Sequence, residues 1–191
     1  MQEACEATRG AMAAVIGLDE APTREVSAQA GVVLANLNCP GQLVISGETE
    51  KIEQACELAK TRGARRALPL TVAGAYHSPL MASAQPKLAA ELDHVQITAP
   101  GAQVISNVTG QPHGGPDTIR KLLVEQVTSS VRWEESMRYL LAQGYTRFIE
   151  LGPGTALSGF MKRIDKRAAM FNVADVPSLQ AAIASLIPPE A

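Results

Sequence analysis

The chain has 191 residues, of which 46% are hydrophobic, with a net charge of −2 and a pI near 5.9. These are the values of an ordinary globular protein of one or two domains. Its Lys and Arg residues are scattered or in short pairs, so it lacks the basic stripe that nucleic-acid binding requires. No apolar run approaches the roughly 20 residues of a membrane helix, and the first nine residues do not resemble a signal peptide. We therefore expect a cytoplasmic protein with neither a nucleic-acid nor a membrane partner.

The cysteines and histidines do not indicate a metal site. Cys5, Cys39 and Cys56 are odd in number, far apart and without C-x-x-C spacing, which argues against a disulfide framework and a zinc site. The three histidines also lack metal-ligand spacing. His94 and His113 lie in polar surroundings, so we expect them at the surface.

The first third of the sequence predicts the order strand, helix, strand, strand, helix, strand. Strands are expected at residues 11–16, 32–37, 42–46 and 65–70, with helices at 20–30 and 48–62. Gly31 ends the first helix, and Pro40-Gly41 predicts a hairpin turn between the two middle strands. The order βαββαβ is typical of a ferredoxin-like unit.

From residue 72 onward, the pattern predicts an α/β arrangement. Short apolar runs at residues 104–108, 148–151 and 169–173 are interpreted as strands of a parallel sheet. Helices are expected at residues 81–92, 116–128, 133–143, 155–164 and 176–186. A sheet of three parallel strands is thin, and its edges need protection.

His77 is the main candidate for chemistry. It lies in a turn just before a predicted helix, where an imidazole can act as a general base while its other nitrogen finds an acceptor. The sequence contains no G-x-S-x-G, the turn that exposes a catalytic serine. From these residues alone, a structural, hydrogen-bonded histidine is the better interpretation, because a single histidine without a partner in the sequence specifies no chemistry.

A second candidate is the turn Leu151-Gly152-Pro153-Gly154, which follows a predicted strand and opens a helix. Its backbone amides could hold an anion. The spacing is not G-x-G-x-x-G, because the next glycine is Gly159, and a tight strand-to-helix turn explains the glycines better than an anion site does.

Four segments resemble the malonyl-CoA:acyl-carrier-protein transacylase family of fatty-acid synthesis, in that family's order and across the whole chain. They are Asn36-Leu37-Asn38-Cys39-Pro40-Gly41-Gln42, Gly74-Ala75-Tyr76-His77-Ser78-Pro79-Leu80-Met81, residues 126–133 and Glu150-Leu151-Gly152-Pro153-Gly154. The resemblance implies a partial α/β-hydrolase-like acyltransferase domain with a ferredoxin-like small subdomain. By that resemblance, residues 1–9 end a helix of the large subdomain, 10–70 form the small subdomain, and 71–191 form the C-terminal part of the large one.

The resemblance also implies a reaction. In this family a serine in G-H-S-x-G takes malonyl from malonyl-CoA and passes it to the phosphopantetheine thiol of acyl carrier protein, by a ping-pong mechanism. His77 matches the base, and Gln126 matches the residue whose backbone carbonyl orients the imidazole. Tyr76 matches an aromatic position of the acyl pocket and favours malonyl over methylmalonyl. Asn38 matches an asparagine near the active site, although its place beside a hairpin turn explains it equally well.

The departures from the family matter as well. The serine turn, the carboxylate-binding arginine and the oxyanion-hole donors are missing, and Met1-Gln2-Glu3-Ala4 matches an internal stretch of the family. We therefore expect a chain that carries the histidine half only and is inactive alone. Ser130 stands where the family commonly has proline, which should loosen that turn.

The implied partners are malonyl-CoA and acyl carrier protein, with no cofactor, and the full-length protein is expected to be a monomer. Three alternatives stay open. They are a non-catalytic module that binds acyl-CoA or carrier protein, a polyketide-type acyltransferase, and a dinucleotide-dependent enzyme.

Overall fold

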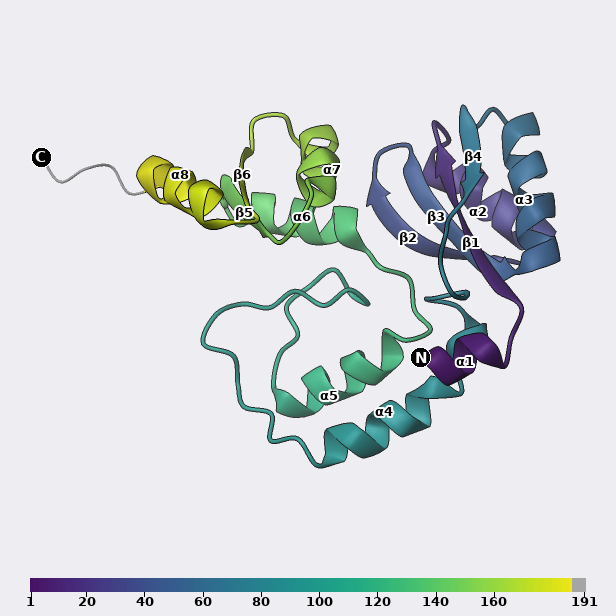
Figure 1. The fold of residues 1–191 in the computed structure, drawn as a ribbon, viewed down its shortest axis with the longest axis horizontal. Helices are drawn as coiled ribbons and strands as arrows, with labels where there is room; N and C mark the ends of the chain where they lie inside the picture. The colour runs from purple at the N-terminus through teal and green to yellow at the C-terminus, as the bar shows by residue number, and fades with distance from the viewer. Residues whose placement is uncertain (187–191) are drawn as a thin grey trace, which may run out of the picture. The chain divides into compact units, whose positions relative to one another are not determined.

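The computed structural model describes residues 1–186 and divides the chain into two compact units, Met1–Ser136 and Met137–Ala191. Figure 1 shows the elements of each unit along the chain. The subdomain boundaries expected after residues 9 and 70 stay predictions.

The first unit is built on a four-stranded antiparallel sheet with two helices. Its elements are β1 (Gly10–Ile16), α2 (Glu20–Ala30), β2 (Val33–Cys39), β3 (Gln42–Glu48), α3 (Thr49–Thr61) and β4 (Arg66–Pro69). The strand order is β2-β3-β1-β4, and all neighbours are antiparallel. This order and the βαββαβ sequence confirm the predicted ferredoxin-like arrangement.

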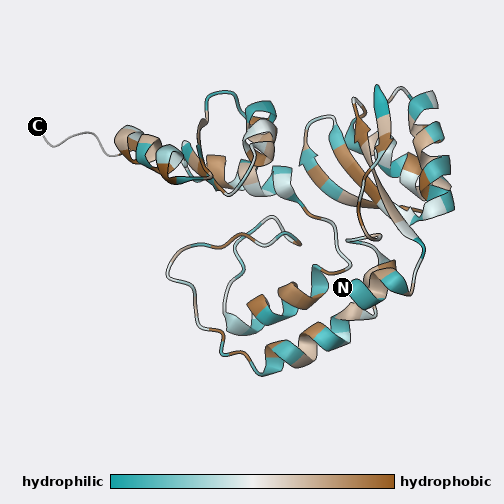
Figure 2. Ribbon diagram, in the orientation of Figure 1, coloured by the Kyte–Doolittle hydropathy of each residue, from teal (hydrophilic) through white to brown (hydrophobic). Residues whose placement is uncertain are grey.

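The main core of this unit lies between the sheet and its two helices. Alternate strand residues point toward the helices because side chains alternate across a strand. The buried set includes Ala13, Val15, Leu34, Leu37, Leu43, Ile45 and Ala67 from the strands, with Val26, Ile52, Ala55, Cys56 and Ala59 from the helices. In Figure 2 the strands are largely brown, whereas α3 carries much teal, as expected for an amphipathic helix covering a sheet.

The glycine turns lie where they were predicted. Gly31 ends α2 in the left-handed conformation with φ +68°, and Gly41 forms the β2–β3 turn with φ +66°. Glycine adopts these angles without a steric penalty, which explains why the sequence signals were correct here.

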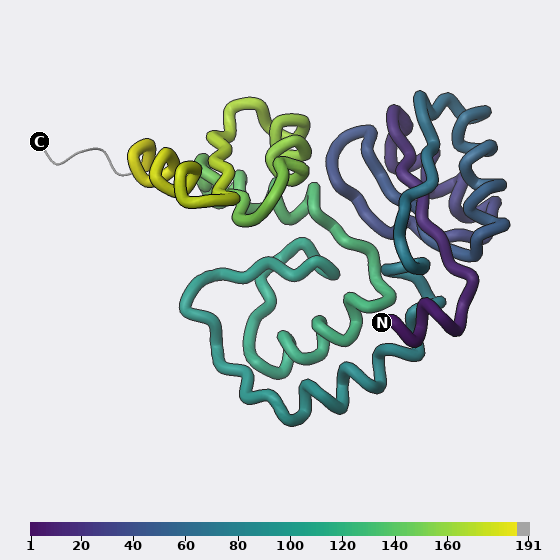
Figure 3. The backbone as a smooth tube through the Cα atoms, in the orientation of Figure 1, coloured from purple at the N-terminus to yellow at the C-terminus, as the bar shows by residue number. Residues whose placement is uncertain are grey.

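The rest of the first unit comprises α1 (Gln2–Glu6), the short 3-10 helix η1 (Pro79–Met81), α4 (Ala84–Asp93) and α5 (Pro116–Glu125). Ala4 and Cys5 of α1 pack with Met81, Ala84 and Val127 in a second, smaller core, which we call the α1–α4 core. The tube in Figure 3 shows α1 beside the chain that leads into α4. This core fixes the chain on both sides of η1.

The strand predicted at residues 104–108 is wrong. Local hydrogen bonds fold this run into a turn, since Ser106 N donates to Gln111 O, Gly110 N donates to Ser106 O, and Val108 N donates to Ser106 Oγ. Only an isolated bridge joins Ile105 and Pro112. The polar Ser106 inside an apolar run competes for the backbone and prevents a strand.

The second unit contains one parallel pair of strands. Helix α6 (Trp133–Ala142) leads into it, followed by β5 (Arg147–Leu151), α7 (Ala156–Ile164), β6 (Ala169–Val173) and α8 (Val176–Leu186). β5 and β6 pair in parallel, so the predicted α/β character is confirmed, but the predicted third strand is absent from the described sheet. Ile149 is 48% exposed and Leu151 is 76% exposed. A face of this small sheet is thus left uncovered.

Among residues 1–186, no helix combines the length and the apolar character needed to cross a membrane.

Candidate functional site

His77 lies in a strained turn between β4 and η1. Its φ of +58° makes it the one non-glycine residue with positive φ in the described part of the chain. This left-handed conformation costs an L-residue about 1–2 kcal/mol, so surrounding contacts must hold it. Such strain is often found at functional sites.

The imidazole is oriented by two backbone carbonyls. Nδ1 of His77 lies 3.1 Å from the carbonyl oxygen of Gln126 and 3.1 Å from that of Ser129. Carbonyl oxygens only accept hydrogen bonds, so this pairing assigns the proton to Nδ1 and leaves Nε2 as a proton acceptor. The ring is half-buried. The sequence indicated Gln126 only through the family resemblance, and nothing in it pointed to Ser129, because a backbone carbonyl has no side-chain signature.

The segment that carries these carbonyls is attached to the edge of the four-stranded sheet. Val131 N donates to Ala35 O at 2.8 Å, and Leu37 N donates to Val131 O at 2.9 Å. The Ser130 hydroxyl donates to Leu34 O. Ser130 therefore adds a bond to β2 that a proline could not make, which offsets the loosening expected from the serine.

His77 lines a hollow of about 660 Å³ within the first unit. One wall comes from α2 and β2, and the other comes from residues 128–130 with Val108 and Pro79. Arg24 and Arg132 also line it, paired with Glu20 at 2.7 Å and Glu135 at 2.9 Å. Its volume lies in the range of roughly 300–1,000 Å³ that small-molecule pockets usually have.

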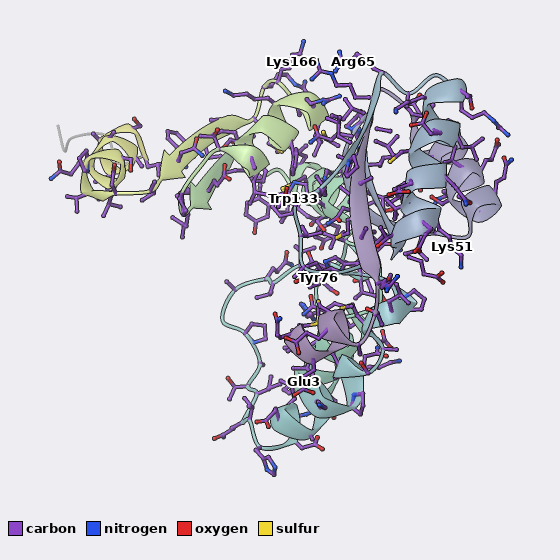
Figure 4. All side chains as sticks on the ribbon, turned by 45° about the vertical axis from the view of Figure 1, so that its right-hand side comes forward. Glu3, Lys51, Arg65, Tyr76, Trp133 and Lys166 are labelled. Atoms are coloured by element: carbon purple, nitrogen blue, oxygen red, sulfur yellow. The ribbon has the colours of Figure 1, made fainter. Side chains whose placement is uncertain are left out.

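Tyr76 and Asn38 are not among the residues that line this hollow. Tyr76 is half-buried and packs against both the α1–α4 core and the sheet residues Met12, Ala35 and Val44. Figure 4 shows it between the sheet and α1, the helix that carries Glu3. A hydrogen bond with Cys5, followed by burial, raises the pKa of the Tyr76 phenol. The acyl-pocket roles of Tyr76 and of half-buried Asn38 stay predictions.

The start of α7, which follows the Gly-Pro-Gly turn of the second unit, holds a carboxylate of the chain itself. Glu150 accepts hydrogen bonds from Leu157 N at 3.0 Å, Ser158 N at 2.8 Å, Ser158 Oγ at 2.6 Å and Asn172 Nδ2 at 2.8 Å. Burial raises the pKa of Glu150, but these hydrogen bonds outweigh burial and the net pKa is lowered. The amides at the start of α7 are already bound, so the turn is better explained as a tight connection than as an anion site.

The other histidines are placed differently from one another. His94 is exposed, as expected. His113 is half-buried rather than at the surface, and its Nδ1 has no hydrogen-bond partner among the described residues. Residues 1–186 contain no group of three or more His, Cys, Asp or Glu side chains arranged to hold a metal ion.

Comparison with known proteins points in one direction. The pattern of the family described as "Acyl transferase domain" matches residues 1–183. Malonyl CoA-acyl carrier protein transacylase of Bacillus subtilis (strain 168) is 44% identical over 191 residues, covering 97% of this chain and 60% of that protein. The chain thus spans about 60% of the length of this curated relative.

Solved structures agree with the sequence match. The malonyl-CoA:acyl carrier protein transacylase of Xanthomonas oryzae pv. oryzae is 40% identical with a TM-score of 0.92, over 96% of this chain and 60% of that one. A malonyl-transacylase in complex with a type II PKS acyl-carrier protein has the same TM-score at 34% identity, over 96% of this chain and 62% of that one. With the fold, the order of the four segments and the family match in agreement, this chain belongs to the acyl transferase domain family, with malonyl-CoA:acyl carrier protein transacylases among its relatives.

Proposed function

We propose that this chain supplies the base of an enzyme that moves malonyl from malonyl-CoA to the phosphopantetheine thiol of acyl carrier protein. The observation that carries the proposal is the pairing of His77 Nδ1 with the carbonyls of Gln126 and Ser129. It leaves Nε2 free to take a proton, as a general base must. The substrates are proposed from the similar proteins, which are malonyl-CoA:acyl carrier protein transacylases.

The proposed reaction has two halves with the same base. In the first, Nε2 of His77 takes the proton of a serine hydroxyl while the oxygen attacks the thioester carbonyl of malonyl-CoA. The tetrahedral intermediate collapses, the carbon–sulfur bond breaks, and the imidazolium returns the proton to the thiolate of coenzyme A. In the second, the pantetheine thiol loses its proton to Nε2 and attacks the malonyl ester, the bond between the acyl carbon and the serine oxygen breaks, and the imidazolium returns the proton to that oxygen. The base is regenerated.

The nucleophilic serine is the part that this sequence lacks, since it contains no G-x-S-x-G. We therefore expect no malonyl transfer by the purified chain, because loss of a nucleophile lowers the rate on the order of 10⁶-fold. Incubation with radiolabelled malonyl-CoA and holo-carrier protein, followed by gel autoradiography, measures this. Labelled carrier protein above the no-enzyme background would contradict the proposal.

A chimera tests the base directly. The part of the Bacillus subtilis relative that lies outside its match to this chain is joined to the chain, and transfer is measured. We expect activity in the chimera and a loss of about 10³-fold in the His77→Asn variant, because asparagine tolerates positive φ but cannot act as the base. His94→Asn, at an exposed position, is the matched control and should retain activity.

The alternatives predict other outcomes. A non-catalytic module would bind acyl-CoA or carrier protein equally well with and without His77, and its chimera would be inactive.

A polyketide-type acyltransferase would prefer a polyketide carrier protein, a possibility favoured by the matched complex with a type II PKS carrier protein. Parallel assays with a fatty-acid and a polyketide carrier protein separate these cases. A dinucleotide enzyme is disfavoured because the turn lacks G-x-G-x-x-G spacing and Glu150 already binds the amides of Leu157 and Ser158 at the start of α7.

A further inference from the structure

Ser78 follows His77 directly and is almost completely buried, with 1% of its surface exposed. Its hydroxyl donates to the carbonyl oxygen of Ala75 at 2.6 Å and accepts a hydrogen bond from Leu80 N at 3.3 Å. The side chain thus joins the backbone before His77 to the backbone after it. The strained residue lies inside this short loop.

Both ends of the loop are fixed by packing. A Cβ built on Gly10, at the start of β1, would lie 2.6 Å from the backbone nitrogen of Ala75, so these two backbones are in close contact. Ala75 is fully buried. On the other side, Leu80 belongs to η1, whose Met81 is also fully buried in the α1–α4 core.

We propose that Ser78 is a positioning residue: its buried hydroxyl holds His77 in the left-handed conformation and thereby aims Nδ1 at the carbonyls of Gln126 and Ser129. Without this hydroxyl, the backbone of His77 relaxes toward negative φ and the ring swings away from both carbonyls. The proton is then no longer confined to Nδ1. Nε2 becomes protonated in part of the molecules and is lost there as an acceptor.

We call the two hydrogen bonds of the Ser78 hydroxyl the Ser78 clamp. Its importance for catalysis rests on the proposed role of His77 as a base. Its effect on the conformation and tautomer of His77 does not, because both are measured without turnover. An inactive chimera would count against the proposed function and leave the clamp unaffected. An unchanged tautomer would count against the clamp alone.

The test uses the chain labelled with ¹⁵N and ¹³C. The ring-nitrogen shifts of His77 report the ratio of the Nδ1–H to the Nε2–H tautomer, and its Cα and Cβ shifts report the backbone conformation. In Ser78→Ala we expect the ratio to fall about tenfold, which corresponds to about 1.4 kcal/mol, the scale of a lost hydrogen bond. The carbon shifts should move away from left-handed values. Ser83→Ala is the matched control, since Ser83 is exposed and makes no capping bond through its side chain.

Two further variants keep the test decisive if Ser78→Ala does not fold. Ser78→Cys has nearly the size of serine but is only a weak donor, so it should shift the ratio in the same direction as alanine. Ser78→Thr keeps the hydroxyl and should restore the tautomer ratio to within twofold of the unsubstituted chain. A folded Ser78→Ala or Ser78→Cys protein with the original ratio and original carbon shifts overturns the proposal.

Discussion

Replacing Glu150 by glutamine tests how the second unit is held together. The carboxylate accepts four hydrogen bonds, one at Oε1 from Leu157 N and three at Oε2 from Ser158 and Asn172. Glutamine can keep the three at one oxygen, but its NH₂ group then faces Leu157 N–H, a second donor. Hydrogen bonds to a charged group contribute about 1.5–3 kcal/mol, against about 0.5–1.5 kcal/mol for neutral ones. At the middle of these ranges, one lost bond and three weakened bonds give an expected destabilisation of about 6 kcal/mol.

The pH dependence of this effect has a definite sign. The pKa of Glu150 is lower in the folded chain than in the unfolded one, because its hydrogen bonds outweigh burial. The stabilisation from its charge is therefore complete above the ordinary glutamate pKa and is lost as pH falls through the lowered pKa of the folded state. Glutamine does not titrate, so the stabilities of the two proteins should converge at acidic pH.

Urea unfolding, followed through the ¹H–¹⁵N signals of residues 147–173 at several pH values, measures both quantities. Asp175→Asn is the control. Like Glu150, Asp175 accepts a hydrogen bond from a backbone amide near the start of a helix, that of Ser178, but Asp175 is exposed. The Asp175→Asn substitution should lower the free energy of unfolding much less than Glu150→Gln does. A Glu150→Gln protein that unfolds at the same urea concentration as the unsubstituted chain, at neutral and acidic pH alike, would refute the reasoning.

Three further substitutions give distinct outcomes. Gly10→Ala should destabilise the first unit by about 2 kcal/mol through the close backbone contact, whereas Gly101→Ala, with open space around it, should change the melting temperature little. Ser130→Pro, the residue common in the family, should lose the bond to Leu34 O but stiffen the turn, leaving the stability measured by thermal unfolding within about 1 kcal/mol. A hydrogen bond from Arg167 lowers the pKa of Asp165 to about 2, so Arg167→Gln should raise that pKa toward its ordinary value in a carbon-detected NMR titration.

The sequence predicted the first sheet well because its signals were local and agreed with one another. Alternating apolar residues fixed the strands, and Gly31 and Pro40-Gly41 fixed their ends. The run at residues 104–108 has a similar composition, but there the Ser106 hydroxyl accepts a hydrogen bond from Val108 N and the backbone forms a turn. The helix predicted from residue 81 also differs, since the chain forms η1 first and α4 starts at Ala84.

The candidate site was predictable only in part, for a physical reason. A histidine in a turn before a helix is visible in sequence, and family resemblance pointed to Gln126. The second carbonyl, from Ser129, and the attachment of residues 130–131 to β2 depend on backbone atoms that every residue has. The family predicts that Tyr76 borders the acyl group, which stays a prediction; in the structure it packs against two cores.

The backbone of residue 77 has a consequence for how the base is probed. At φ +58° the chain already has the geometry that glycine prefers, so a His77→Gly chain removes the ring and relieves the strain at the same time. The vacated space opens into the hollow beside Ser129, within reach of small solutes. Free imidazole added to a catalytically complete protein could occupy that space and take over the proton, a form of chemical rescue that alanine, which keeps the strain, would serve less well.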